Sequence, residues 1–167
     1  IVGDFNVELE MGKPLFAFEK IPMSKMVDPS NITLNIDNKT FANGFCVNVG
    51  NPHIIFFVKD CFEYDLRVIG PKIENHALFP EKTNVTFAQV IDKENIAVNV
   101  WERGAGLTKA CGTAACATAY AAKINDKIKN KTEIEFEIGK LSILIDENDN
   151  ILMKGPVSNI NKIDIKI

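Results

Sequence analysis

The stretch that decides the fold is WERGAGLTKACGTAACATAYAA, residues 101–122. It opens with the end of a strand-like run and passes through a glycine-rich turn before it reaches Cys111. Alanine dominates the run that follows and proline is absent from it, which predicts a helix over residues 113–124. A cysteine therefore stands where a turn becomes a helix, a place where its proton affinity is expected to change.

The composition is that of a soluble globular protein. The chain has 167 residues, enough for one domain or for one lobe and a half. A formal net charge of -3 gives no electrostatic reason to expect a nucleic-acid partner. Apolar runs stay far below the roughly 20 residues of a membrane span, and the amino end shows no signal-peptide pattern. We therefore expect a cytoplasmic protein without a membrane or nucleic-acid partner.

The chain begins at Ile1 within a strand-like pattern. We interpret it as a fragment of a longer protein, although a processed or shortened chain would begin in the same way. Farther along, Gly12, Pro14 and Pro22 are typical of a connection between two lobes.

Alternating apolar and polar residues predict strands along most of the chain. They cover residues 5–11, 32–37, 41–49, 54–58, 84–91 and 95–101. After the helix we expect a meander of three short strands, with turns at Gly139-Lys140 and at 147–150, and a last strand at 160–167. Apolar residues at helical spacing before a Gly-Pro pair predict a short helix over 60–69. The fold class is therefore α+β, with mostly antiparallel strands wrapped round one central helix.

Cys111 is the strongest candidate for chemistry. A helix amino terminus carries partial positive charge, so it should lower the pKa of a thiol from about 8.5 toward neutral. The N–H groups of Gly112, Thr113 and Ala114 would also point at an anion beside the thiol. A thiol next to a carboxylate site suits proton transfer on an amino or hydroxy acid. The alternative is that Cys111 only begins a tightly packed helix.

The other cysteines have simpler interpretations. Cys46 and Cys61 read as small buried hydrophobes, and Cys116 as a packing residue within the helix. Disulfides are not expected in a chain without secretion signals. The spacing of Cys111 and Cys116 is poor for zinc, because a second ligand pair is missing.

Several polar residues interrupt apolar surroundings. They are Asn51, His53, Asn84, Glu102 and Arg103. Each is a weak signal, since an Asn near a turn usually caps backbone and a lone His is usually a satisfied core or surface residue. Together with the thiol they supply the donors and acceptors needed to hold both ends of an amino acid while one carbon is deprotonated.

Four blocks of sequence carry a family resemblance. GNPH at 50–53, EKTNVTF at 81–87, ERGAGLTKACGTAACA at 102–117 and MKGPV at 153–157 resemble the diaminopimelate epimerase family, in this order and at its spacing. The resemblance implies two similar lobes that face each other across a cleft. Each lobe supplies one cysteine, and the pair acts without pyridoxal phosphate or metal.

The resemblance also implies a division of this chain. Residues 1–13 would end the amino-terminal lobe, 14–155 would form the carboxy-terminal epimerase lobe, and 156–167 would return as a strand to the first lobe. The first-lobe motif, an Asn-Gly-x-x-Cys stretch, is absent from the sequence. The amino-terminal lobe would therefore be largely missing, the fragment inactive alone, and the full-length enzyme a homodimer.

By the same resemblance, Cys111 is the second catalytic cysteine, and His53 and Glu102 tune the cysteines. The residues that match substrate contacts are Asn51, Asn84, Glu102, Arg103, Gly112 and Thr113. Ala114 departs mildly from the family, which often has glycine there.

The implied function is the interconversion of LL- and meso-diaminopimelate, in the biosynthesis of lysine and peptidoglycan precursors, with no cofactor. One thiolate would remove the α-proton while the opposite thiol delivers another. Three alternatives remain open: a proline racemase or hydroxyproline epimerase, a thiol hydrolase that pairs Cys111 with His53 or His76, and a non-catalytic ligand-binding lobe.

Overall fold

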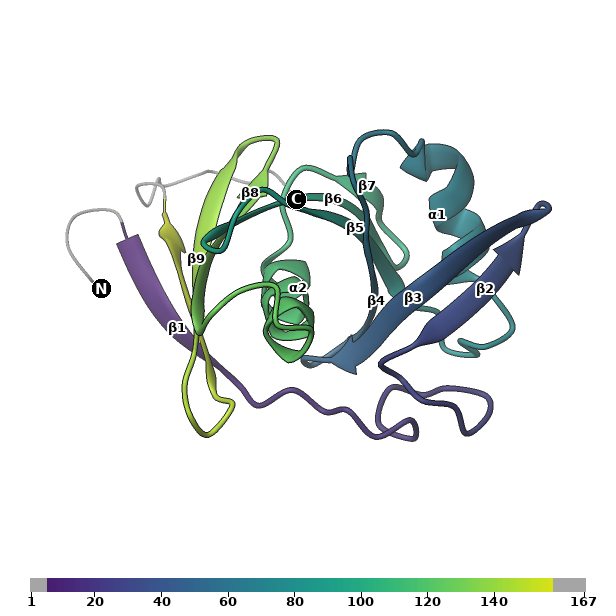
Figure 1. Ribbon diagram of the computed structural model, residues 1–167, viewed down its shortest axis with the longest axis horizontal. Coiled ribbons are helices and arrows are strands. Elements are labelled where there is room, and N and C mark those ends of the chain that lie inside the picture. The colour runs from purple at the N-terminus through teal and green to yellow at the C-terminus, as the bar shows by residue number, and fades with distance from the viewer. Residues whose placement is uncertain (1–5, 158–167) are drawn as a thin grey trace, which may run out of the picture.

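A computed structural model describes residues 6–157, which form one mixed sheet and two helices (Figure 1). The helices are α1 (Leu66–Glu74) and α2 (Gly112–Ile124). The strands are β1 (Asn6–Gly12), β2 (Ile32–Ile36), β3 (Lys39–Asn48), β4 (Pro52–Phe57), β5 (Asn84–Val90), β6 (Asn95–Glu102), β7 (Gly106–Thr108), β8 (Lys131–Phe136), β9 (Gly139–Ile145) and β10 (Ile151–Pro156). The predicted α+β class is confirmed.

The strands follow the order β1-β10-β9-β8-β6-β5-β4-β3-β2, and the short β7 pairs with β6 off this path. Most neighbours are antiparallel, as expected from the sequence. Two pairs are parallel, β4 with β5 and β6 with β8. A helix connects each parallel pair: α1 lies between β4 and β5 in the chain, and α2 between β6 and β8.

The topology explains why the two helices lie on opposite faces of the sheet. The connection from β4 to β5 and the connection from β6 to β8 both move in the same direction along the strand order. Because β5 and β6 are antiparallel, the pair β4 and β5 runs in the opposite direction to the pair β6 and β8. Two crossovers of the usual right-handed sense must then lie on opposite faces. In Figure 1, α2 is seen end-on in the hollow of the curved sheet, and α1 lies outside that hollow.

Each helix covers its own hydrophobic core. On β4, Ile55 belongs to the core around α2, whereas Ile54 and Phe56 belong to the core around α1. This alternation follows from the period of two along a strand. The alanines of α2 are buried almost all round, and their small side chains let the helix lie close to the sheet. These two clusters are called the α2 core and the α1 core below.

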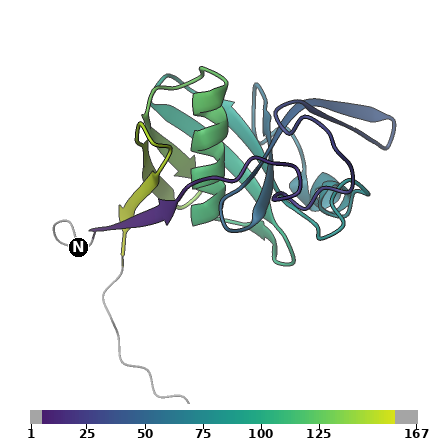
Figure 2. The same ribbon diagram turned by 90° about the horizontal axis from the view of Figure 1, so that it is seen from below.

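The segment 13–31 crosses the open side of the hollow, below α2 in Figure 1 and in front of it in Figure 2. Leu15 makes a backbone bridge with Asn48, and the ring of Phe16 stacks on Phe45 with centroids 5.0 Å apart. Phe16 packs against the α2 core, whereas Phe18, Ile21 and Met23 pack in the α1 core, so the segment passes from one core to the other.

The helix predicted over 60–69 is displaced in the structure. Helix α1 begins after Asp65, whose carboxylate accepts a hydrogen bond from the backbone N–H of Arg67. It continues through Gly70 and Pro71, which the sequence suggested as its end. Gly70 instead serves close packing, because a Cβ there would lie 2.6 Å from the indole of Trp101.

Other differences are small. The strand predictions up to residue 101 and the helix over 113–124 agree with the structure to within two residues. The turn expected at Gly139-Lys140 lies at 137–138, and β7 was not predicted. The strand expected at 160–167 lies outside the described residues. No helix within residues 6–157 is long and apolar enough to cross a membrane.

Candidate active site

Three of the predicted site residues form one row across neighbouring strands. His53 of β4 is the ladder partner of Asn84 on β5. Val85 pairs with Trp101, so the same register places Asn84 opposite Glu102 at the end of β6. By the alternation of each strand, all three side chains are on the sheet face that α2 covers. Cys111 lies directly before α2, and the row is therefore on the same side of the sheet as the thiol.

Cys111 is the N-cap residue of α2. Its backbone is extended, with φ -152° and ψ 113°, and the side chain makes no capping hydrogen bond. The Sγ atom lies 3.4 Å from the hydroxyl oxygen of Thr113. Only 8% of the residue is exposed, so the thiol is largely shielded from water.

The prediction that the helix terminus lowers the pKa of Cys111 is wrong in this structure. Burial raises the pKa of the thiol above its ordinary value, and this exceeds the lowering by hydrogen bonds from Thr113 and the Ala114 N–H. The Glu102 carboxylate raises the pKa further. The thiolate loses more by leaving water than it gains from the helix terminus. Burial therefore favours the neutral thiol of Cys111 over the thiolate.

His53 is fully buried and neutral. Its Nε2 lies 2.8 Å from Oδ1 of Asn51, so that nitrogen carries the proton and donates it to the amide oxygen. Burial, together with the charge of Arg103, lowers the pKa of His53 to about 3. Nδ1 has no hydrogen-bond partner within residues 6–157. His76, by contrast, accepts a hydrogen bond from the N–H of Leu78. Among the described residues, neither imidazole makes a hydrogen bond to Cys111, whose thiol contacts Thr113 instead.

Asn84 connects two strands through its side chain. Its Nδ2 donates to the carbonyl of Pro52 at 2.8 Å, and its Oδ1 accepts from the N–H of Arg103 at 2.8 Å. The exposed guanidinium of Arg103 donates through Nη1 to the carbonyl of Glu81 at 2.9 Å. Asn84 therefore orients the backbone at Arg103, and the residue is only 2% exposed.

Gly112 packs against the last described strand. A Cβ on Gly112 would lie 3.1 Å from the sulfur of Met153, within β10. A larger residue would displace this methionine, which also packs on the α2 core. The absence of a side chain at Gly112 thus serves packing against β10, and the access for a ligand stays a prediction.

The remaining cysteines are packing residues, as predicted. Cys46 and Cys61 lie in the α1 core, and Cys116 lies in the α2 core, each 0% exposed. Burial raises the pKa of all three, to about 11 for Cys61 and about 12 for Cys116. All four thiols of the chain are free. The described part of the chain holds no cluster of three or more His, Cys, Asp or Glu side chains suited to a metal ion.

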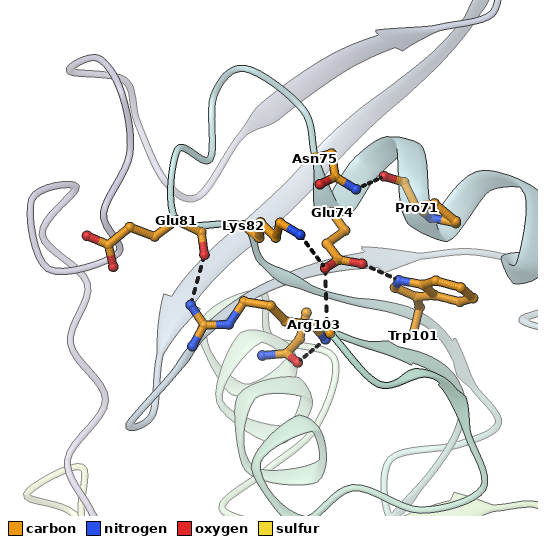
Figure 3. A network of polar contacts seen from close by, with 9 residues as sticks. Pro71, Glu74, Asn75, Glu81, Lys82, Trp101 and Arg103 are labelled. Carbon is orange, nitrogen blue, oxygen red and sulfur yellow. Dashed lines mark hydrogen bonds and ion pairs between the residues drawn. The ribbon is translucent and has the colours of Figure 1, made fainter.

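One residue near the site was not anticipated. Glu74, the last residue of α1, is buried and accepts hydrogen bonds from Trp101 and from the N–H of Gly104 (Figure 3). The glutamate lies in an ordinary helical pattern of the sequence. Its burial follows from the position of α1 against β6, which local spacing does not reveal.

The chain was compared with known proteins. The diaminopimelate epimerase family model matches residues 45–160. The diaminopimelate epimerase of Pelagibacter ubique is 56% identical over 170 residues, which covers 100% of this chain and 62% of that protein. That of a Wolbachia from Brugia malayi is 41% identical, over 93% of this chain and 59% of that protein. The chain thus spans about three fifths of the length of these relatives.

Solved structures agree on the fold. A predicted epimerase from Pseudomonas aeruginosa has a TM-score of 0.55 at 14% identity, over 90% of this chain and 55% of that one. Methylitaconate-delta-isomerase has a TM-score of 0.51 at 13% identity, over 77% and 48%. Such low identities support the architecture alone. The match of the family model over most of the chain shows that this protein belongs to the diaminopimelate epimerase family.

Proposed function

We propose that this chain supplies one half of the active site of a diaminopimelate epimerase, with Cys111 as one of two acid–base thiols. The observation that carries the proposal is the position of Cys111 at the start of α2, beside Glu102 and Thr113. The N–H groups of the first turn of α2 would bind the substrate α-carboxylate next to the thiol. There they would also stabilise the charge that develops when the α-proton leaves.

The protonation state suits one direction of the reaction. Burial keeps Cys111 in the thiol form, so this residue is ready to deliver a proton to one face of the α-carbon. A thiolate on the other face removes the proton that leaves. In the reverse direction the two thiols exchange roles, and Cys111 receives the proton as thiolate.

The second thiol has to come from outside this chain. Inversion at carbon needs an acid and a base on opposite faces of the substrate. Cys46, Cys61 and Cys116 are all sealed within the two cores and cannot reach a substrate bound at Cys111. We infer that a second lobe carries the other thiol, and that the complete enzyme is a cytoplasmic homodimer that needs no cofactor.

The exposed guanidinium of Arg103 is suited to the distal carboxylate of diaminopimelate. Its anchoring to the carbonyl of Glu81 sets its direction and leaves a planar donor group for a carboxylate. A substrate without a second charged end, such as proline, would not use this contact. In this proposal His53 and Asn51 orient the row beside Asn84 rather than transfer protons.

The test joins this chain to the segment of the Pelagibacter ubique relative that it does not match. Deuterium uptake from heavy water at the α-carbon is measured with LL-diaminopimelate, meso-diaminopimelate and L-proline. Uptake with both diaminopimelate isomers, and none for residues 1–167 alone, is the expected result. Exchange with proline only would indicate a proline racemase. A covalent acyl-enzyme without exchange would indicate a thiol hydrolase, and either result would overturn the proposal.

A further inference from the structure

The buried carboxylate of Glu74 lies on the opposite side of the sheet from the thiol. Its side chain is 6% exposed, an unusual place for a charged group. Lys82 approaches it at 3.8 Å, but the lysine is 52% exposed and contributes little in water. Two N–H groups satisfy the carboxylate instead. Oε2 accepts from the indole of Trp101 at 2.7 Å, and Oε1 accepts from the N–H of Gly104 at 3.1 Å.

These two partners flank the residues that matter for the proposed function. Glu102 and Arg103 lie between Trp101 and Gly104. The N–H of Ala105 donates to the carbonyl of Glu102 at 3.1 Å and closes a turn over residues 102–105, called the 102–105 turn below. Figure 3 shows the carboxylate of Glu74 between the Trp101 ring and the backbone of this turn. One side chain therefore holds both ends of the segment.

The turn is held from the other side as well. Asn84 Oδ1 accepts the N–H of Arg103, and it does so from the face that α2 covers. Gly104 has a φ of +77°, which fits the third position of a type II turn and leaves its N–H directed at Glu74. The turn thus has one anchor on each face of the sheet, a neutral amide and a carboxylate.

The fit between α1 and the turn is close. Gly70 lies one helical turn before Glu74, and a Cβ there would lie 2.6 Å from the Trp101 ring. The ring therefore cannot move toward the helix, and its N–H stays directed at the carboxylate. The position of α1 therefore fixes the position of the 102–105 turn, through the contact of Gly70 with Trp101 and the hydrogen bonds of Glu74.

We propose that Glu74 is a positioning residue that sets the orientation of Glu102 and Arg103, and hence the binding of the substrate and the environment of Cys111. The partners of the carboxylate are Trp101, Gly104 and Lys82 and not Cys111, so it acts through the turn. A carboxylate is required because both of its partners are donors. An amide at this position has to present its own N–H₂ group to one of them.

Glu74→Gln is the sharpest variant, because it keeps the shape and removes one acceptor. The part of the test that rests on the proposed function uses the joined enzyme described above. There, Glu74→Gln should raise the KM for diaminopimelate about tenfold, with a smaller change in kcat, since the contact of Arg103 with substrate is made before and during reaction. The matched control is Glu63→Gln, an exposed glutamate before α1, which should leave both constants unchanged.

A second measurement is independent of the reaction. The rate of alkylation of Cys111 by iodoacetamide is followed by peptide mass spectrometry on residues 1–167, which separates this thiol from the three buried ones. Displacement of Glu102 removes a carboxylate from beside Cys111, so Glu74→Gln should make alkylation several-fold faster at a given pH. Adding Trp101→Phe to Glu74→Gln removes the opposed donor and should bring the rate back toward that of the parent.

Glu74→Asp covers the case in which the amide variant does not fold. It keeps the charge but is too short to accept from both donors, and it should change the alkylation rate in the same direction. Parental alkylation in a folded Glu74→Asp or Glu74→Gln variant would overturn the proposal, because Glu74 would then serve stability alone. A changed alkylation rate without any epimerase activity in the joined enzyme would support the role of Glu74 and reject the proposed function.

Discussion

Cys111 Sγ lies 3.4 Å from Thr113 Oγ1, and this contact joins the thiol to the first turn of α2. The Thr113 hydroxyl lowers the pKa of the thiol, while burial and the Glu102 carboxylate raise it. The pKa of Cys111, and with it the reactivity of the thiol, thus depends on the Thr113 hydroxyl, which lowers it, and on burial and Glu102, which raise it. The Thr113 hydroxyl can be removed by substitution without removing the thiol.

Thr113→Val removes the hydroxyl at nearly constant volume. Because the hydroxyl lowers the pKa of Cys111, its loss should raise that pKa further. The thiolate fraction at neutral pH then falls, and alkylation of Cys111 should become several-fold slower at pH 7 and recover only at higher pH. The control is Thr118→Val in the same helix, whose buried hydroxyl has no partner within residues 6–157. A faster alkylation in Thr113→Val would contradict the assignment.

Cys111→Ser tests the role of the thiol in the joined enzyme. Serine keeps a hydrogen-bond donor but has a far higher proton affinity than a thiol. Deuterium uptake at the face served by Cys111 should fall by about 10²–10⁴-fold, which is the usual contribution of general acid–base catalysis. Elimination from a halogenated analogue whose proton lies on the other face needs one base only and should largely survive.

Cys116→Ser is the matched control for that experiment. Cys116 lies in the α2 core, so the change should cost stability, about 1–3 kcal/mol, and have little effect on the rate. Chemical denaturation and deuterium uptake separate the two effects. Equal loss of uptake in both variants would mean that damage to the helix, and not loss of the thiol, was responsible.

Gly70→Ala tests the packing of α1 on Trp101. Alanine favours the helix by about 0.5–1 kcal/mol, but its Cβ would lie 2.6 Å from the indole ring. The overpacking should exceed that gain and lower the free energy of unfolding by about 1–3 kcal/mol. Val68→Ala on the exposed side of the same helix should change it by less than about 0.5 kcal/mol. A stabilised Gly70→Ala protein would refute the close contact.

His53 should make stability depend on pH. Folding lowers its pKa from 6.5 to about 3, so the unfolded chain binds a proton that the folded chain does not. The stability contributed by neutral His53 is present above pH 6.5 and is lost as the pH falls toward 3, with a limiting slope of about 1.4 kcal/mol per pH unit. Urea denaturation between pH 7 and 5 should show a slope that approaches this limit near pH 5, and His53→Gln should reduce it to the share of His76, whose pKa is also lowered by burial. The same slope in both proteins would assign it to other groups.

Several features of the fold and of the site could be predicted from the sequence alone. Alternation identified the strands, the alanine run identified α2, and the motif around Cys111 identified the family. These features are local, because strand alternation, helix propensity and the position of a residue at a helix start depend on neighbours in sequence. Cys46, Cys61 and Cys116 were also recognised as buried residues, since a cysteine in an apolar run seldom has another role.

Only the tertiary structure decided the rest. Helix α1 continues through Gly70 and Pro71, where the sequence predicted its end. Gly70 is needed there for close packing against Trp101, which lies far away in the sequence. The tertiary structure gave Glu74 its two donors and brought His53, Asn84 and Glu102 into one row. It also reversed the expected pKa shift of Cys111, because the cost of burying a thiolate depends on every element packed around it. The spacing of residues along the chain does not show which distant segments pack together, or which side chains lose their contact with water when they do.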